Sequence, residues 1–435
     1  MDKVSKKFLL NELNENCSVT PMLLDALSKN EQQMVALAAA MEKIDPRMSG
    51  KVMHKAGTIM LVALMGVFAG AQTWNQVANY GKAKIELLKR FIPDIESIPE
   101  HDTIRRFFMI VDSRKLEEVY REWALGFQGE LADMESSVNE DGCHVERRHL
   151  AIDGKTICGA IAPDKVYMEN RGKMTKEQAE YARLHMVSLY NTDAGVSLAQ
   201  ERVNVKENEL AAIPKLLEVA DLGKGDIVTI DAMGTHAEFA KAITEKGADY
   251  IFEVKGNQRK LKEHLADCME LFREPAYRSM YDMAEETLTD HSMITHRTCY
   301  VLKLEALMLK LREKWPGMNT IGAIVTTRTG KDGTSNTEEH YFISSLPKDP
   351  ILIMKHKREH WKVENALHWN LDIIFNEDKG RKMMTSAQNY SLLTKMALAI
   401  LKNDKRKMAM TDKRLMAGWD DNYMETLVRR FICSF

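Results

Sequence analysis

The stretch HLAIDGKTICGA, His149 to Ala160, decides the fold, because it places an aspartate inside an apolar strand. Asp153 stands there between Ile152 and a glycine, and a second aspartate, Asp231, ends the apolar run IVTID. A charged side chain at such a position is costly to bury unless it is paired or binds a cation. Open sheets place their sites at the carboxyl ends of strands. Both aspartates are therefore candidates for one site at a sheet edge.

The segments around these aspartates alternate between strand and helix patterns. Strands are expected at 149–160, 183–191, 196–203, 226–232 and 249–255, and helices at 209–220 and 236–247. The order of three strands, helix, strand, helix, strand matches the ribonuclease-H-like arrangement, a mixed sheet flanked by helices. We therefore predict an α/β fold of this class.

The remaining segments suggest how the chain is divided. Residues 1–126 are predicted to form an all-helical N-terminal domain, and 127–146 a polar, acidic linker. A catalytic domain at 147–405 contains a β-rich insertion at 257–350 and is followed by a basic tail at 406–435. The most apolar stretch, AGTIMLVALMGVFAGA at 56–71, is too short to span a bilayer comfortably and predicts a buried core helix.

Composition sets the broad class of protein. The 435 residues correspond to two or three domains, and 45% hydrophobic with 29% charged residues is an ordinary soluble profile without a membrane span. Six cysteines without a CxxC pair suggest neither a zinc knuckle nor a disulfide framework and fit a reducing cytoplasm. The net charge of −2 argues mildly against nucleic acid, but residues 351–414 carry 14 lysines and arginines against 7 acidic residues. That local surplus is compatible with DNA binding by one face.

A long helix predicted to start near Leu352 carries the third candidate carboxylate. His360, Glu364, His368 and Asp372 recur every four residues and therefore share one helical stripe. An apolar stripe runs beside them, so Glu364 is expected at the edge of the buried face, directed toward the sheet rather than toward water.

Three carboxylates at a sheet edge can hold two divalent ions about 4 Å apart, which is an arrangement for phosphoryl transfer. Ligation by oxygen alone favours Mg²⁺ or Mn²⁺. The helix also carries histidines, so zinc is an alternative, although His360 and His368 are eight residues apart rather than four. From the residues alone a structural interpretation stays open, in which each aspartate makes a turn or an ion pair and the polar stripe is a solvated helix face.

Several ordered motifs resemble one known family. They are HLAIDGKTICGA, VTIDAMG, GADYIFEVKGNQ, HYFISSLP and REHWKVENALHWNLDIIFNED. Together they resemble the bacterial insertion-sequence transposases that include the H-repeat-associated proteins. The stretches QTWNQVANYG and PEHDTIRRFF resemble the helical domain that accompanies that catalytic domain. The resemblance covers roughly residues 30 to 405.

The resemblance implies a DDE transposase with a ribonuclease-H-like fold and a β-strand insertion before the final glutamate. Its catalytic and metal-binding residues match Asp153, Asp231 and Glu364, with two Mg²⁺ or Mn²⁺ ions as cofactors. The implied reaction cuts transposon ends and joins the freed 3′-hydroxyl to target DNA. The implied partners are terminal inverted repeats, target DNA and a second copy of the chain. His360 departs from the related transposases, which carry arginine there.

Polar residues near these motifs are candidates for DNA contacts. The candidates are Lys155, Lys255, Asn257 and Gln258 after the strands, His360, Trp361, Asn365 and His368 on the helix, and Lys402, Lys405, Arg406 and Lys407 in the basic run. Solvated surface groups are the alternative for the first set, and a core position is the alternative for Trp361. Two other functions stay open: a decayed or domesticated copy that binds DNA without cutting, and a plain metal-dependent nuclease.

Overall fold

The computed structural model describes residues 29–135, 148–161, 184–203, 208–290, 293–303, 309–380 and 382–435. The chain forms two compact units. Unit 1 combines residues 1–138, 157–184 and 369–435, and unit 2 combines residues 139–156 and 185–368. This division differs from the consecutive domains expected from the sequence, because residues 369–405 group with the N-terminal helices. Residues 136–146 of the expected linker lie outside the described residues.

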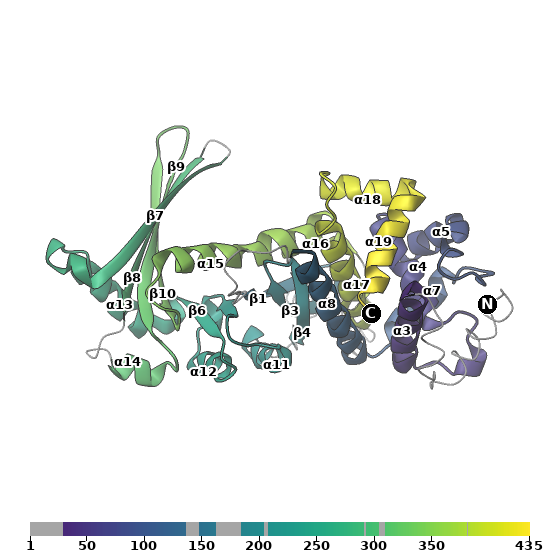
Figure 1. Cartoon of the computed structure of the whole chain (residues 1–435), viewed down its shortest axis with the longest axis horizontal. Coiled ribbons are helices and arrows are strands. Elements are labelled where there is room, and N and C mark those ends of the chain that lie inside the picture. The colour runs from purple at the N-terminus through teal and green to yellow at the C-terminus, as the bar shows by residue number, and fades with distance from the viewer. Residues whose placement is uncertain are drawn as a thin grey trace, which may run out of the picture. The chain divides into compact units, whose positions relative to one another are not determined.

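Unit 2 is built on a nine-stranded sheet with the order β4-β3-β1-β5-β6-β10-β9-β8-β7 (Figure 1). Its first five strands are β4 (Val196–Val203), β3 (Leu184–Asn191), β1 (His149–Ile157), β5 (Ile227–Ile230) and β6 (Asp249–Val254). Strands β3 and β4 are antiparallel, whereas β1, β5 and β6 run parallel to one another. The α/β, ribonuclease-H-like fold predicted from the order of elements is therefore confirmed.

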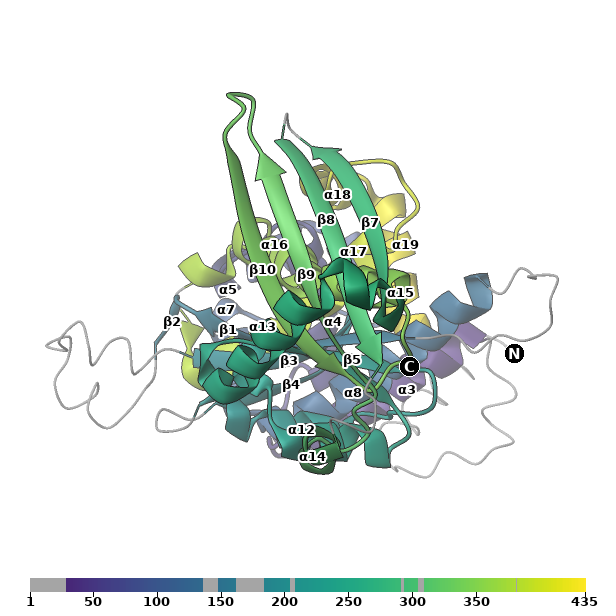
Figure 2. The same ribbon diagram turned by 90° about the vertical axis from the view of Figure 1, so that its left-hand side faces the viewer.

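The strands of the expected insertion extend this same sheet. Strand β10 (Ser335–Ser344) pairs antiparallel with β6, and β9 (Thr320–Thr329), β8 (Met293–Lys303) and β7 (Tyr281–Asp290) follow outward (Figure 2). Helices α13 (Arg259–Phe272) and α14 (Leu309–Lys314) also belong to this segment. Strand β7 was not foreseen, because its sequence YDMAEETLTD has little apolar alternation.

The two faces of the sheet have separate cores. On β5, Val228 and Ile230 belong to the core that contains α11 (Ile213–Val219) and α12 (Ala237–Glu245). Ile227 instead belongs to the core that contains α15 (Pro350–Lys362). Because side chains alternate between faces along a strand, Thr229 and Asp231 also lie on the α15 side. The same alternation places Ala151 and Asp153 on that side, since Leu150 and Ile152 belong to the first core.

Unit 1 is helical and centres on α4 (Ala56–Phe68), in which every residue except Gly57 and Thr58 is buried. The buried core helix predicted from the apolar run is therefore confirmed. Within the described parts of the chain, no helix is both long and apolar enough to cross a bilayer. The other helices of unit 1 include α3 (Lys29–Ile44), α5 (Trp74–Ala83), α6 (Ile85–Leu88), α7 (His101–Ile110), α8 (Ser113–Glu135), α16 (Trp369–Ile373) and α17 (Met384–Lys402).

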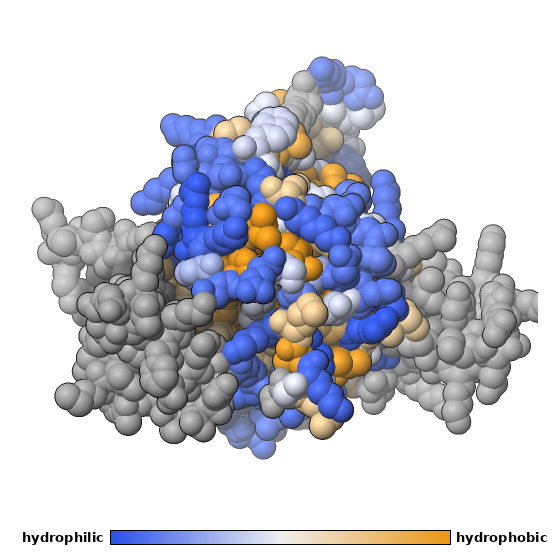
Figure 3. Space-filling model, turned by 90° about the vertical axis from the view of Figure 1, so that its right-hand side faces the viewer, coloured by the Kyte–Doolittle hydropathy of each residue, from blue (hydrophilic) through white to orange (hydrophobic). Residues whose placement is uncertain are grey.

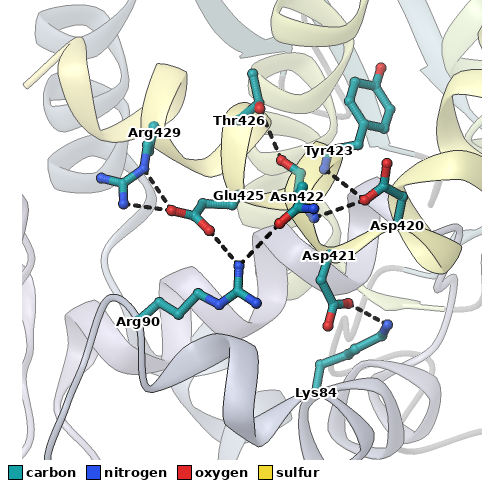
Figure 4. Close-up of polar contacts among 9 residues, drawn as sticks. All are labelled: Lys84, Arg90, Asp420, Asp421, Asn422, Tyr423, Glu425, Thr426 and Arg429. Atoms are coloured by element: carbon teal, nitrogen blue, oxygen red, sulfur yellow. Dashed lines mark hydrogen bonds and ion pairs between the residues drawn. The ribbon is translucent and has the colours of Figure 1, made fainter.

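The last thirty residues, expected as a basic tail, contain α18 (Met410–Trp419) and α19 (Asp421–Cys433). Helix α19 is tied to the N-terminal helices by ion pairs of 2.5 Å between Lys84 and Asp421 and 2.6 Å between Arg90 and Glu425 (Figure 4). Its last turn also accepts a hydrogen bond, because Trp123 Nε1 donates to the Phe431 carbonyl at 3.1 Å. The C-terminal segment is thus part of the packed helical unit.

Unit 1 also leaves large apolar side chains in water, with Met53 exposed by 85% and Trp419 by 70%. Figure 3 shows apolar side chains gathered between hydrophilic ones on one side of the molecule.

Near its start, β9 leaves no room for a side chain at Gly322, and this gives a test of the extended sheet. A Cβ there would lie 2.2 Å from the Tyr300 carbonyl oxygen and 2.4 Å from the Phe342 ring. We expect Gly322→Ala to lower the free energy of unfolding by about 2 kcal/mol or more, measured by urea denaturation. Gly223→Ala, where nothing lies within 4 Å, is the matched control. An equal effect of the two changes would contradict this packing.

Candidate active site

The sheet register sets three acidic residues in a row. Ile152 of β1 pairs with Ile230 of β5, and Ile230 pairs with Phe252 of β6. The next residue of each strand is acidic: Asp153, Asp231 and Glu253. Because the three strands are parallel neighbours, these residues follow one another across the carboxyl edge on the side of α15.

Asp153 sits where a negative charge is unfavourable. Its pKa is raised to about 7, mainly by burial and also by the charges of Glu209, Asp231 and Glu364, against a hydrogen bond from the Gly154 backbone that lowers it. His368 Nδ1 lies 3.4 Å from its Oδ2. The side chain keeps 25% of its surface exposed, so solvent and solutes can reach it.

Asp231 is the N-cap of the short helix η3 (Ala232–Gly234), where its Oδ1 accepts from the Gly234 N–H at 3.3 Å. Burial and the charge of Glu209 raise its pKa. Two of the residues predicted to contact DNA hold the loop that follows: Asn257 Nδ2 donates to the Ala232 carbonyl at 2.6 Å, and Gln258 Nε2 to the Thr235 carbonyl at 2.9 Å. These amides therefore position the Asp231 loop.

Glu364 lies in a π-helical turn, Val363–His368, that follows α15 directly. Its side chain is exposed, so the expectation that it faces the sheet rather than water is wrong. The physical reason is the wider turn, because a π-helix does not keep residues four apart on one stripe. Glu364 still lies near enough to Asp153 for its charge to raise the pKa of that carboxyl.

Glu253, the third acid of the row, has cationic neighbours. His340 Nδ1 lies 2.8 Å, Lys357 Nζ 3.0 Å and Lys255 Nζ 3.2 Å from its carboxylate oxygens. Burial alone would raise its pKa, but the bond from His340 and the charges of the two lysines hold the pKa of Glu253 well below its usual range. The side chain of Lys255, a predicted DNA contact, is 56% exposed.

His360 is bonded to the sheet. Its Nδ1 lies 2.9 Å from Thr229 Oγ1, which is also 3.0 Å from His149 Nε2, and His149 Nδ1 lies 2.8 Å from Thr192 Oγ1. Burial lowers the pKa of His360 to about 3, so the ring is neutral at pH 7. The neutral imidazole thus fastens α15 to β5 through Nδ1, and a DNA contact by His360 stays a prediction.

The other predicted DNA contacts lie in differing surroundings. Trp361 is 56% exposed and Asn365 is exposed, so Trp361 does not occupy the core position considered as its alternative. Lys155 and His368 are buried, at 9% and 8% exposure. In the basic run, Lys402 is half-buried, Lys405 and Lys407 are exposed, and the Arg406 guanidinium lies 4.0 Å from the centre of the Tyr423 ring.

The donor set fits a divalent cation in chemical type. Asp153, Asp231 and Glu364 offer only oxygen ligands, as Mg²⁺ and Mn²⁺ prefer. Burial, and then repulsion by the neighbouring carboxylates, raise the pKa of Asp153, and a cation would relieve both. Across the described residues, however, no three His, Cys, Asp or Glu side chains already stand close enough to hold an ion. Binding therefore requires side chains to draw together, and the exposed Glu364 has the freedom to do so.

Two residues beside Asp153 were not foreseen from the sequence, Glu209 and His185. His185 Nε2 lies 2.7 Å from Glu209 Oε1, and Glu209 is the carboxylate whose charge acts most on both aspartates. A polar residue inside the apolar strand LHMVSLYN was the available signal for His185. Glu209 starts a helical segment, where an acidic residue is ordinary.

Comparisons with known proteins settle the family. Residues 144–400 match the transposase DDE domain, and residues 40–124 match the domain described as DDE_Tnp_1-associated. The chain belongs to the DDE transposase family.

Relatives of this DDE transposase are bacterial. Putative protein YbfL of Escherichia coli K12 is 30% identical over 391 residues, which cover 88% of this chain and 95% of the relative. Putative transposase YncI of E. coli O157:H7 is 31% identical, covering 88% and 92%, and the H repeat-associated putative transposase YhhI of strain K12 is 29% identical, covering 88% and 95%. A solved piggyBac transposase synaptic complex with hairpin DNA matches 94% of this chain and 83% of its own, at 10% identity and a TM-score of 0.39.

The neutral histidines make stability depend on pH. The folded pKa of His360 is about 3 against an ordinary 6.5, and burial also lowers the pKa of His149. The unfolded chain therefore takes up these protons first as the pH falls. Stability is fully present above about pH 6.5 and is lost toward pH 3, by up to roughly 1.4 kcal/mol per pH unit for each histidine.

Urea denaturation at pH 7.5 and pH 5 checks this expectation. His360→Gln keeps a hydrogen-bonding group for Thr229 but cannot be protonated, so its loss of stability between the two pH values should be smaller than in the wild type. The same loss in both proteins would show that His360 is not the group responsible.

Proposed function

We propose that this transposase cuts and joins DNA strands in a reaction that depends on two Mg²⁺ or Mn²⁺ ions held by Asp153, Asp231 and Glu364. The observation that carries the proposal is the register of β1 and β5, which makes the two aspartates neighbours on one face. The charge of Glu364 acts on Asp153 from the helix that lies over that face. Like charges gathered at a partly buried sheet edge repel one another, and a bound cation would offset that repulsion.

The residues of the chain have distinct tasks in this proposal. Asp153 and Asp231 provide oxygens from a rigid sheet, and Glu364 adds its carboxylate from a movable turn. When bound, the ions activate the attacking water or 3′-hydroxyl and stabilise the leaving oxygen. His368, 3.4 Å from Asp153, orients that carboxylate, while Asn257 and Gln258 fix the loop after Asp231.

The substrate in this proposal is DNA: the terminal inverted repeats of an insertion sequence and a target duplex, held by a homodimer at the nucleoid. Trp361, exposed three residues before Glu364, offers a ring on which a base can stack. Lys405 and Lys407, both exposed, offer charges for the phosphate backbone.

Removing one ligand should abolish strand cleavage. We expect Asp153→Asn, Asp231→Asn and Glu364→Gln each to lower the rate of Mg²⁺-dependent cleavage of terminal-repeat DNA at least about a thousandfold, because each change removes charge that holds the ions. Asp332→Asn, in the β9–β10 turn, is the control and should cut normally. Cleavage by Asp231→Asn at the wild-type rate would reject this site. DNA binding without cleavage by the wild type, under any divalent ion, would instead favour a decayed copy.

The basic run should contribute affinity that does not depend on sequence. We expect Lys405→Ala with Lys407→Ala to reduce the slope of log binding constant against log salt concentration by up to about 1.8, since each phosphate contact contributes about 0.9. Fluorescence anisotropy with specific and unrelated duplexes measures it. Lys331→Ala, at the exposed β9–β10 turn, serves as the control, and an unchanged slope in the double variant would place the DNA elsewhere.

A further inference from the structure

A fourth acidic residue lies directly beside Asp153, on the other face of β1. A Cβ built on Gly154 would stand 2.1 Å from Glu209 Oε1 and 2.8 Å from His185 Nε2. Glu209 thus occupies the space that a side chain at position 154 would need. Since alternate residues point to opposite faces, the Glu209 carboxylate lies across the strand backbone from the Asp153 side chain.

Two residues hold this carboxylate in place. His185 Nε2 lies 2.7 Å from Glu209 Oε1, and because a carboxylate only accepts, Nε2 carries the hydrogen and donates it. His185 Nδ1 is in turn 2.8 Å from Thr156 Oγ1 on β1. The chain Thr156–His185–Glu209 therefore fixes a negative charge against the strand that carries the first aspartate.

The charge of Glu209 reaches both aspartates. Its Oε1 lies against the backbone of Gly154, the residue next to Asp153, and Asp153 and Asp231 each follow one of the paired residues Ile152 and Ile230. A charge that makes carboxylates repel in the absence of a cation makes the same place more attractive to a cation.

We propose that Glu209, held by His185 and Thr156, is a positioning residue that strengthens the binding of divalent cations at Asp153 and Asp231 without contacting them. This inference rests on the proposed function, because it presumes that these aspartates bind a cation. A fixed negative charge a few ångströms from a divalent cation typically strengthens its binding about tenfold or more at the effective dielectric of a protein surface.

Binding of Mn²⁺ to the full chain, measured by electron paramagnetic resonance of the free ion, tests the proposal without any assay of cleavage. We expect Glu209→Gln to weaken binding by about tenfold while thermal unfolding stays near that of the wild type. Glu201→Gln is the matched control, because Glu201 has a similar side-chain exposure, 29% against 23%, and a single ion pair with Lys215. The control should bind Mn²⁺ as the wild type does.

Substitutions at His185 separate positioning from folding. His185→Gln keeps a donor for Glu209 and should bind Mn²⁺ nearly as tightly as the wild type, whereas His185→Leu cannot donate and should bind several-fold more weakly. Should Glu209→Gln fail to fold, Glu209→Asp keeps the charge but withdraws it from Gly154, and it should also weaken binding. Wild-type affinity in the folded Glu209 variant would overturn the proposal.

The proposed function fails differently. If Asp153→Asn and Asp231→Asn abolish Mn²⁺ binding while Glu209→Gln leaves it intact, only the role of Glu209 is rejected. If the wild type binds no Mn²⁺, the cation site itself is rejected and the role of Glu209 with it.

Discussion

The parallel pairing of β1 with β5 is the constraint on which the site depends. Ile152 and Ile230 are opposite each other in the parallel register, so Asp153 and Asp231 follow side by side. A slip of one residue would turn one of the two carboxylates to the opposite face. The buried alternation of Leu150, Ile152, Val228 and Ile230 prevents that slip, since it would carry an apolar row out of its core.

The helix above the sheet is fastened by a different kind of contact. Apolar side chains such as Ile353 and Met354 pack against the sheet, and His360 bonds to Thr229 of β5. Beyond that point the helix widens into the turn that carries Glu364 and His368. The sheet thus holds the two aspartates in fixed places, whereas the turn that follows the anchored helix leaves Glu364 a range of positions. Such turns are frequent at functional sites.

Much of this was predictable from the sequence, and the failures have physical causes. Strands and helices around Asp153 and Asp231 followed from period-two and helical patterns, and β4 has the expected bounds, Val196–Val203. Helix periodicity could not foresee that Glu364 is exposed, because a π turn leaves no mark in residue spacing. Neither could it find Glu209, whose importance arises only from its approach to Gly154 and His185. The division into units was also hidden, because helices far apart in sequence join through contacts such as those of Trp123 with Phe431.

Unit 1 is completed late in synthesis, because it combines helices that are far apart in the sequence. Helix α4, with Leu61 and Phe68 fully buried, packs against α17 and α19, which are encoded more than three hundred residues later. During translation α4 can pack early against α3 and α5, but the surfaces that contact α17 and α19 stay uncovered until those helices have been made. A product that ends before α17 would keep that apolar surface exposed and would be a target for chaperones and proteases. Incomplete copies of the polypeptide would thus tend to be removed.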